Sequence, residues 1–171
     1  MSVTPLMRIP VGVVVERRKA KSQWIDHVWR PVAALDGVPE AAPWTLLSEE
    51  GEAATFFVGA ATIDLYRSET AHYRDNLASG TPQIWVVLRP ADGEHPYDLF
   101  LVTADPAEGE GYTETGTDLV DPVPMPEAIQ AAIADFVTEH HVERPFFKRK
   151  RDRANPDALG RRGRVAERDE G

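Results

Sequence analysis

The chain contains no cysteine among its 171 residues. It can therefore form no disulfide, use no thiolate nucleophile and hold no zinc ribbon or cysteine-ligated iron–sulfur cluster. Long apolar runs are missing too, because the longest candidate, residues 53–63, falls short of the ~18–20 apolar residues that a membrane-spanning helix needs. The N-terminus has no basic start followed by an apolar block, so we expect no secretory signal and a cytoplasmic location.

Two loop motifs typical of enzyme sites are also missing. No glycine-rich loop of the phosphate-binding type occurs, since Gly109-Glu110-Gly111 is flanked by acidic residues that would repel a phosphate, and no Gly-x-Ser-x-Gly elbow occurs. None of the five histidines stands at a spacing typical of paired metal ligands. We therefore expect no cofactor and no metal ion, and the residues favour a binding protein over an enzyme.

Charge is distributed very unevenly along the chain. The net charge is −9, and residues 40–121 contain sixteen acidic residues against three arginines. Residues 148–171 contain nine basic and five acidic residues. An acidic body repels phosphate backbones, so nucleic-acid binding would have to come from this tail alone and is not expected. The tail has too few apolar side chains to repay its ordering entropy. The sequence thus predicts one domain over residues 1–147 and a flexible basic tail over 148–171.

Apolar periodicity within residues 1–147 predicts an α+β domain. β-branched or alternating segments indicate strands, and a proline in residues 27–35 makes that strand an edge strand or one with a bulge. Ser68 before an acidic first turn predicts a helix over 69–78, and one-face apolar spacing predicts a second over 126–140. Residues 104–124 read as an exposed acidic loop. We expect a single antiparallel, twisted sheet of about six or seven strands with two helices, the strands lying at 9–16, 27–35, 44–48, 55–59, 61–67, 83–89 and 97–103.

Large aromatic residues suggest how the protein binds a partner, because they either fill a core or concentrate interface energy. Trp85 lies in a dense apolar strand and reads as core, whereas Trp24 and Trp29 stand among basic and polar residues. Near the end of the chain, two phenylalanines precede a basic cluster in a pattern typical of a docking peptide. The candidate partner-binding residues are Trp24, Trp29, Phe146, Phe147, Lys148, Arg149, Lys150 and Arg151.

Three stretches of the chain together resemble one family. They are residues 10–18 with 24–32, residues 65–77 leading into 85–89, and residues 144–151. They resemble the uncharacterised proteobacterial family known as domain of unknown function 3305. The resemblance implies a bacterial protein whose family genes often stand near those of formate dehydrogenase and its accessory proteins. It implies no established activity and no catalytic residues.

Some members of that family are labelled as molybdopterin-guanine dinucleotide biosynthesis proteins, which would make them nucleotidyltransferases. That chemistry needs a glycine-rich N-terminal loop to bind nucleotide phosphates. Here the first expected strand runs directly into Glu16-Arg17-Arg18-Lys19 without such a loop. The sequence therefore gives no support to that label.

Two functions stay open on these observations. The first is a non-catalytic accessory protein that binds a molybdenum-dependent formate dehydrogenase or one of its maturation factors. The second is an enzyme or small-molecule binder with a pocket on the sheet, formed by Arg67, Glu69, His72 and Tyr73. Clustering of these four side chains in a cleft would favour the second function.

Overall fold

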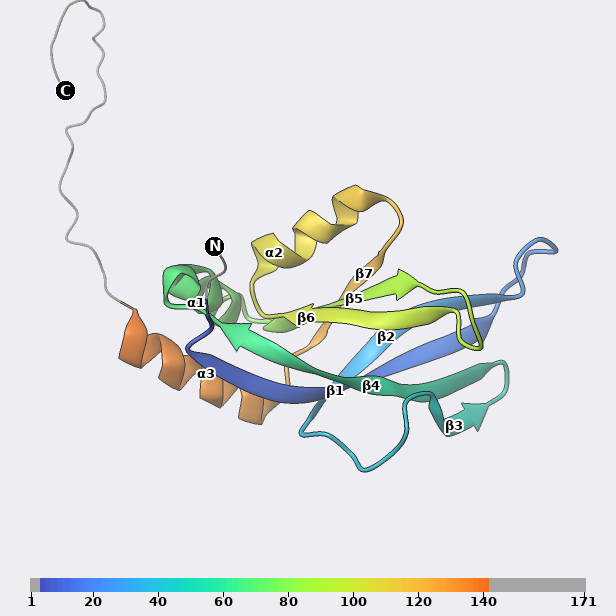
Figure 1. Cartoon of the computed structure of the whole chain (residues 1–171), viewed down its shortest axis with the longest axis horizontal. Coiled ribbons are helices and arrows are strands. Elements are labelled where there is room, and N and C mark those ends of the chain that lie inside the picture. Colours follow the sequence, from blue (N-terminus) through green and yellow to red (C-terminus); the bar gives the residue numbers. More distant parts are fainter. Residues whose placement is uncertain (1–3, 142–171) are drawn as a thin grey trace, which may run out of the picture. The chain divides into compact units, whose positions relative to one another are not determined.

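A computed structural model describes residues 4–141, which form one α+β domain (Figure 1). Its strands form two antiparallel sheets instead of the single sheet expected. The four-stranded sheet has the order β2-β1-β4-β3 and the three-stranded sheet has the order β6-β5-β7. The strands are β1 Met7–Lys19, β2 His27–Asp36, β3 Thr45–Glu50, β4 Ala53–Leu65, β5 Gln83–Pro90, β6 Tyr97–Thr103 and β7 Leu119–Pro124.

The long strand β1 organises the first sheet. It pairs with β2 on one side and with β4 on the other, and Val11, Val13 and Val15 alternate into the core with no exposed surface. Pro31 in β2 has no N–H to donate. As predicted, β2 is an edge strand, and its ladder with β1 shifts register where Val15 pairs with Pro31.

Residues 4–141 contain three α-helices, one more than expected: α1 Thr70–Ala78, α2 Pro106–Gly111 and α3 Glu127–His140. Helix α3 confirms its prediction, because Ile129, Ile133 and Phe136 enter a core shared with both sheets. Helix α1 follows a 3-10 turn, Arg67–Glu69, which we label η1. The N-cap residue of α1 is Glu69, not the expected Ser68. The Ser68 hydroxyl donates a hydrogen bond to the Glu69 carboxylate instead.

The prediction of an exposed acidic loop over residues 104–124 is wrong. This segment holds α2, a second 3-10 turn (η2, Tyr112–Thr115) and β7, which pairs with β5. The Asp105 carboxylate caps α2 by accepting hydrogen bonds from the backbone N–H groups of Ala107 and Glu108. Loop-like composition misleads here because a side-chain cap and close packing of Gly109 on Trp85 supply the order. Among the described residues, no helix has both the length and the apolarity needed to cross a membrane.

Candidate functional site

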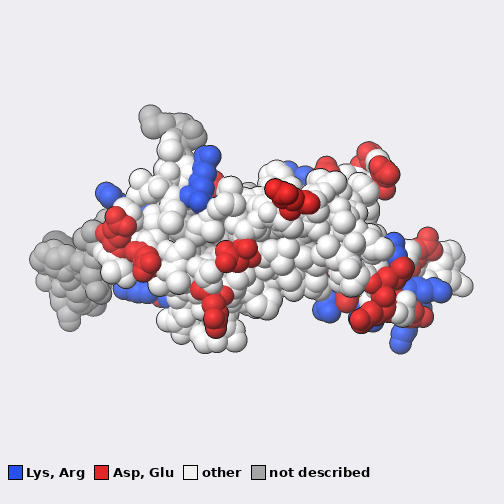
Figure 2. All heavy atoms as spheres, turned by 90° about the horizontal axis from the view of Figure 1, so that it is seen from below, with Lys and Arg blue, Asp and Glu red and all other residues white. Residues whose placement is uncertain are grey.

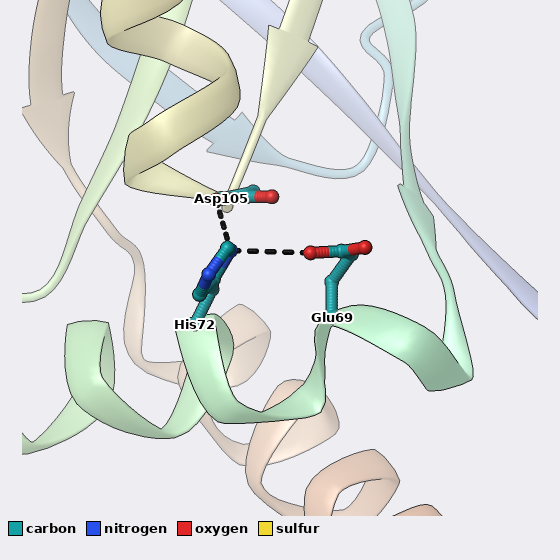
Figure 3. Close-up of side chains that lie close together, drawn as sticks. All are labelled: Glu69, His72 and Asp105. Atoms are coloured by element: carbon teal, nitrogen blue, oxygen red, sulfur yellow. Dashed lines mark hydrogen bonds and ion pairs between the residues drawn. The ribbon is translucent and has the colours of Figure 1, made fainter. Parts of the chain in front are cut away.

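A cluster of three polar side chains lies where the start of α1 meets the junction between β6 and α2. Glu69 and His72 are three residues apart, which places them on one face of the helix start. Asp105 approaches them from the other chain segment (Figure 3). His72 Nδ1 lies 2.9 Å from Asp105 Oδ1 and 3.2 Å from Glu69 Oε1. Residues far apart in the sequence thus bring one imidazole nitrogen against two carboxylates.

The electrostatics of this cluster favour positive charge on or beside His72. The hydrogen bond to Asp105 raises the pKa of His72 above its usual value, burial opposes the rise, and the charges of Asp105, Glu69 and Asp75 add to it. The Asp105 side chain is only 10% exposed, whereas those of His72 and Glu69 are 45% and 36% exposed. The cluster therefore has one rigid, buried carboxylate and an open side toward solvent.

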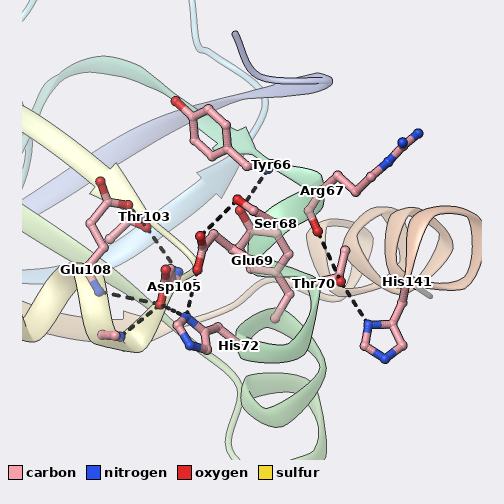
Figure 4. Close-up of polar contacts among 12 residues, drawn as sticks. Tyr66, Arg67, Ser68, Glu69, Thr70, His72, Thr103, Asp105, Glu108 and His141 are labelled. Carbon is pink, nitrogen blue, oxygen red and sulfur yellow. Dashed lines mark hydrogen bonds and ion pairs between the residues drawn. The ribbon is translucent and has the colours of Figure 1, made fainter. Parts of the chain in front are cut away.

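Hydrogen bonds around the cluster fix its position (Figure 4). The Asp105 N–H donates to the Thr103 hydroxyl, which in turn donates to the Glu108 carboxylate at 2.6 Å. On the other side of α1, the Thr70 hydroxyl lies 2.8 Å from Nδ1 of His141, so the end of α3 is tied to α1. Both elements that carry the cluster are thereby anchored.

Only two of the four residues expected to line a pocket lie together in the structure. These two are Glu69 and His72, whereas Arg67 is exposed and its side chain extends away from the cluster (Figure 4). Tyr73 is buried in the core, where its hydroxyl accepts a hydrogen bond from the Tyr66 N–H at 2.9 Å. Burial raises the pKa of Tyr73 to about 12. Tyr73 is thus a core residue.

A hollow of about 220 Å³ lies near the cluster, between β4 and β6. Burial raises the pKa of Tyr66 in its wall, and the charges of Asp64 and Glu108 raise it further. His72 and Glu69 do not line this hollow, which is formed by Ala61, Thr62, Asp64, Tyr66, Phe100, Leu101, Val102 and Glu108.

The second candidate site is the tip of the hairpin that joins β1 to β2, residues 20–26, which extends beyond the body of its sheet (Figure 1). Trp24 is 84% exposed, and Ile25 and Val28 beside it are exposed as well. Trp29 is different from Trp24. It is half-buried, and its ring centroid lies 5.6 Å from that of Trp44 and 5.9 Å from that of Phe56. Of these two tryptophans, Trp24 is therefore the one exposed for binding, and Trp29 supports the base of the hairpin.

The basic residues near this tip do not form an isolated positive surface. Arg17 lies 4.0 Å from Glu49, and the Lys19 N–H donates to the Glu52 carbonyl. The acidic end of β3 and the turn that follows it thus lie beside the basic end of β1. Figure 2 shows acidic and basic side chains intermixed at the right-hand end of the domain, which is the end where the β1–β2 hairpin tip lies in Figure 1. The remaining expected partner-binding residues, Phe146, Phe147, Lys148, Arg149, Lys150 and Arg151, lie outside the described residues.

Comparison with known proteins fits the resemblance seen in the sequence. The family model described as "Protein of unknown function (DUF3305)" matches residues 10–151. The chain belongs to the DUF3305 family. No curated protein and no solved structure shows a significant match to it.

Sequence reasoning did not find Asp105, the buried member of the polar cluster. It lies in the segment expected to be a loop, so nothing pointed to its meeting α1. One signal was present: Asp105 directly precedes Pro106, and an acidic residue followed by proline is a pattern typical of a helix start.

Proposed function

We propose that this DUF3305 protein is a non-catalytic accessory factor that binds a protein partner through the β1–β2 hairpin tip. The observation that carries this proposal is the 84% exposure of Trp24. A tryptophan left in water on a protruding turn is an unused source of interface energy, because burying an indole removes a large apolar area from water. Ile25 and Val28 extend the same apolar contact.

The hairpin below the tip is built firmly enough to present this anchor. Strand β1 pairs with two neighbours over most of its length. Glu16 accepts hydrogen bonds from Arg30 of β2 and from Arg18. The Arg17 guanidinium lies 5.2 Å from the Phe56 ring centroid and 6.0 Å from that of Trp29. A rigid base lowers the entropy cost of binding at the tip.

The charges near the tip favour a protein over a lipid surface as the partner. A peripheral membrane anchor combines aromatic residues with an uncompensated basic cluster that attracts anionic headgroups. Here Glu49 and Glu50 end β3 and Glu52 follows in the turn, beside Arg17 and Lys19. We therefore infer a partner with an apolar pocket of indole size and a rim that carries charges of both signs.

The partner that the family resemblance implies is a molybdenum-dependent formate dehydrogenase or one of its maturation factors, met in the cytoplasm. We propose this assignment together with a second contact by Phe146, Phe147 and the basic residues 148–151. The alternative pocket of Arg67, Glu69, His72 and Tyr73 has less support, because Tyr73 is buried and Arg67 points elsewhere.

The test is direct binding between the purified full-length chain and purified formate dehydrogenase or its maturation factors, measured by calorimetry. Trp24→Ala should weaken binding by about 30-fold or more, the loss typical of a hot-spot tryptophan. Leu6→Ala is the matched control, because Leu6 is 53% exposed just before the opposite end of β1. Equal affinities for the two variants would refute the proposal. Binding of anionic vesicles that needs Trp24, with no protein binding, would also refute it.

A further inference from the structure

We propose that Glu69, His72 and Asp105 form a binding site for one divalent transition-metal ion such as Zn²⁺. This site is independent of the hairpin tip and adds a metal-binding function to a chain whose histidine spacing gave no sign of one. It joins a Glu-x-x-His pair on one helix with a carboxylate from a different segment.

The distances in the cluster are close to the spacing between ligands around one ion. One ligand atom from each of the three residues lies within 4.8 Å of the other two, and His72 Nδ1 lies 3.2 Å from Glu69 Oε1. The 2.9 Å contact of His72 Nδ1 with Asp105 is to Oδ1, so Oδ2 of the same carboxylate is next to it. Around a tetrahedral ion with bonds of roughly 2.0–2.2 Å to nitrogen and oxygen, neighbouring ligand atoms stand about 3.3–3.6 Å apart. The Glu69 side chain is 36% exposed and therefore has room to turn toward an ion.

An unused ligand atom points to the same conclusion. The Asp105 side chain is 10% exposed, and its Oδ1 takes all the hydrogen bonds that this carboxylate makes to the described residues, from Ala107 N–H, Glu108 N–H and His72. Within residues 4–141, Oδ2 has no hydrogen-bond partner. A carboxylate oxygen without a donor is costly in a side chain that is only 10% exposed as a whole. Figure 3 shows the carboxyl groups of Asp105 and Glu69 on the Nδ1 side of the imidazole, while the rest of the ring points away. A metal ion on that side would use Oδ2.

The chemistry of the ligand set selects the class of ion. Two carboxylates neutralise a divalent charge when the imidazole is neutral. An imidazole nitrogen among the ligands favours Zn²⁺ and its transition-metal neighbours over Ca²⁺ and Mg²⁺, which prefer oxygen ligands alone. Because His72 and Glu69 are partly exposed, water would complete the coordination.

A proton on His72 is the rival occupant, since a charged imidazole would make the same two contacts without a metal. The two explanations differ in one measurable respect. A protonated His72 needs no metal and gives the protein no specific zinc affinity. The proposed site binds one zinc ion per chain and binds it about tenfold or more weakly when any of the three ligands is removed.

The experiment is zinc titration of the full-length chain, with any affinity tag removed, by calorimetry at neutral pH, repeated with Co²⁺ as a spectroscopic probe. His72→Gln, Glu69→Gln and Asp105→Asn are the variants, and circular dichroism checks their fold. Asp105→Asn keeps a side-chain oxygen for the α2 amides, because asparagine is also a good N-cap. His27→Gln, in an exposed position outside the cluster, is the matched control.

We expect one zinc ion per chain, with an affinity that falls about tenfold or more in each cluster variant and is unchanged in His27→Gln. The Co²⁺ absorption bands of the ligated ion should disappear in His72→Gln. Failure of the wild-type chain to bind zinc would overturn the proposal, and so would binding that survives in His72→Gln and Glu69→Gln. Neither result would bear on Trp24 and its partner.

Discussion

Two glycines of the six-residue helix α2 should respond in opposite directions to the same substitution. A Cβ built on Gly109 would lie 2.7 Å from Cδ1 of Trp85 and closer still to its Cβ and Cγ. A Cβ on Gly111 would meet no atom within 4 Å. Both glycines lie in the same helix, so intrinsic helix propensity favours alanine at both. Gly109 is buried against Trp85, whereas Gly111 is the exposed last residue of the helix.

The magnitudes follow from that contact. Trp85 belongs to β5, the central strand of its sheet, so its Cβ cannot retreat without moving the strand. Overpacking of this kind costs about 1–3 kcal/mol, which exceeds the ~0.5–1 kcal/mol that alanine gains in a helix. We therefore expect Gly109→Ala to be destabilised by about 1–2 kcal/mol. Gly111→Ala should be stabilised by about 0.4–1 kcal/mol.

The assay is urea unfolding of both variants and the wild type, followed by far-ultraviolet circular dichroism. The slope of the free energy of unfolding with urea should be the same in all three, so that midpoints compare stability directly. Gly109→Ala should also weaken zinc binding, because a displaced α2 carries Asp105 with it. The reasoning is refuted if Gly109→Ala is as stable as Gly111→Ala.

Three further changes test the buried polar contacts. Tyr73→Phe should cost about 1–2 kcal/mol, because the Tyr66 N–H loses its acceptor. The pKa of Tyr73 is raised to about 12, so wild-type stability should fall as the pH rises from ~10 toward that value, and this part of the fall should be missing from alkaline urea titrations of the variant. Asn76→Ala should cost about 2–4 kcal/mol in urea unfolding, since the buried amide bonds three backbone groups of two other segments. Burial alone would raise the pKa of Glu16, but hydrogen bonds from Arg30 and Arg18 lower it below its usual value. The ionised Glu16 carboxylate and its two arginine partners therefore stabilise the fold at pH values above the unfolded pKa of ~4.3. Thermal unfolding should therefore lose that contribution as the pH falls below this value, and Glu16→Gln should show a weaker acid dependence.

The elements that sequence reasoning found correctly are those with strong local signals. Apolar spacing along 126–140 placed Ile129, Ile133 and Phe136 on the core face of α3, as the structure shows. Pro31 cannot donate a ladder hydrogen bond, and this alone identified an edge strand with an irregular register. These features depend on residues that are neighbours in the sequence.

The elements that it missed depend on tertiary contacts. Helix α2 is only six residues long and contains two glycines, so its order comes from the Asp105 cap and from Trp85 beneath Gly109. The division into two sheets depends on which strands pair, and local patterns do not encode that choice. Two of the three residues of the polar cluster, Glu69 and His72, were predicted because they are close in sequence. Asp105 was missed because it is 33 residues away from His72.

The most direct test of the proposed function is photo-crosslinking in living cells with a benzophenone side chain at position 24. The matched control carries the same side chain at position 6, at the far end of β1. We predict a covalent product between position 24 and a subunit of formate dehydrogenase or one of its maturation factors, identified by mass spectrometry, and no such product from position 6. The absence of that product at position 24, or its equal formation from both positions, would contradict docking through the hairpin tip.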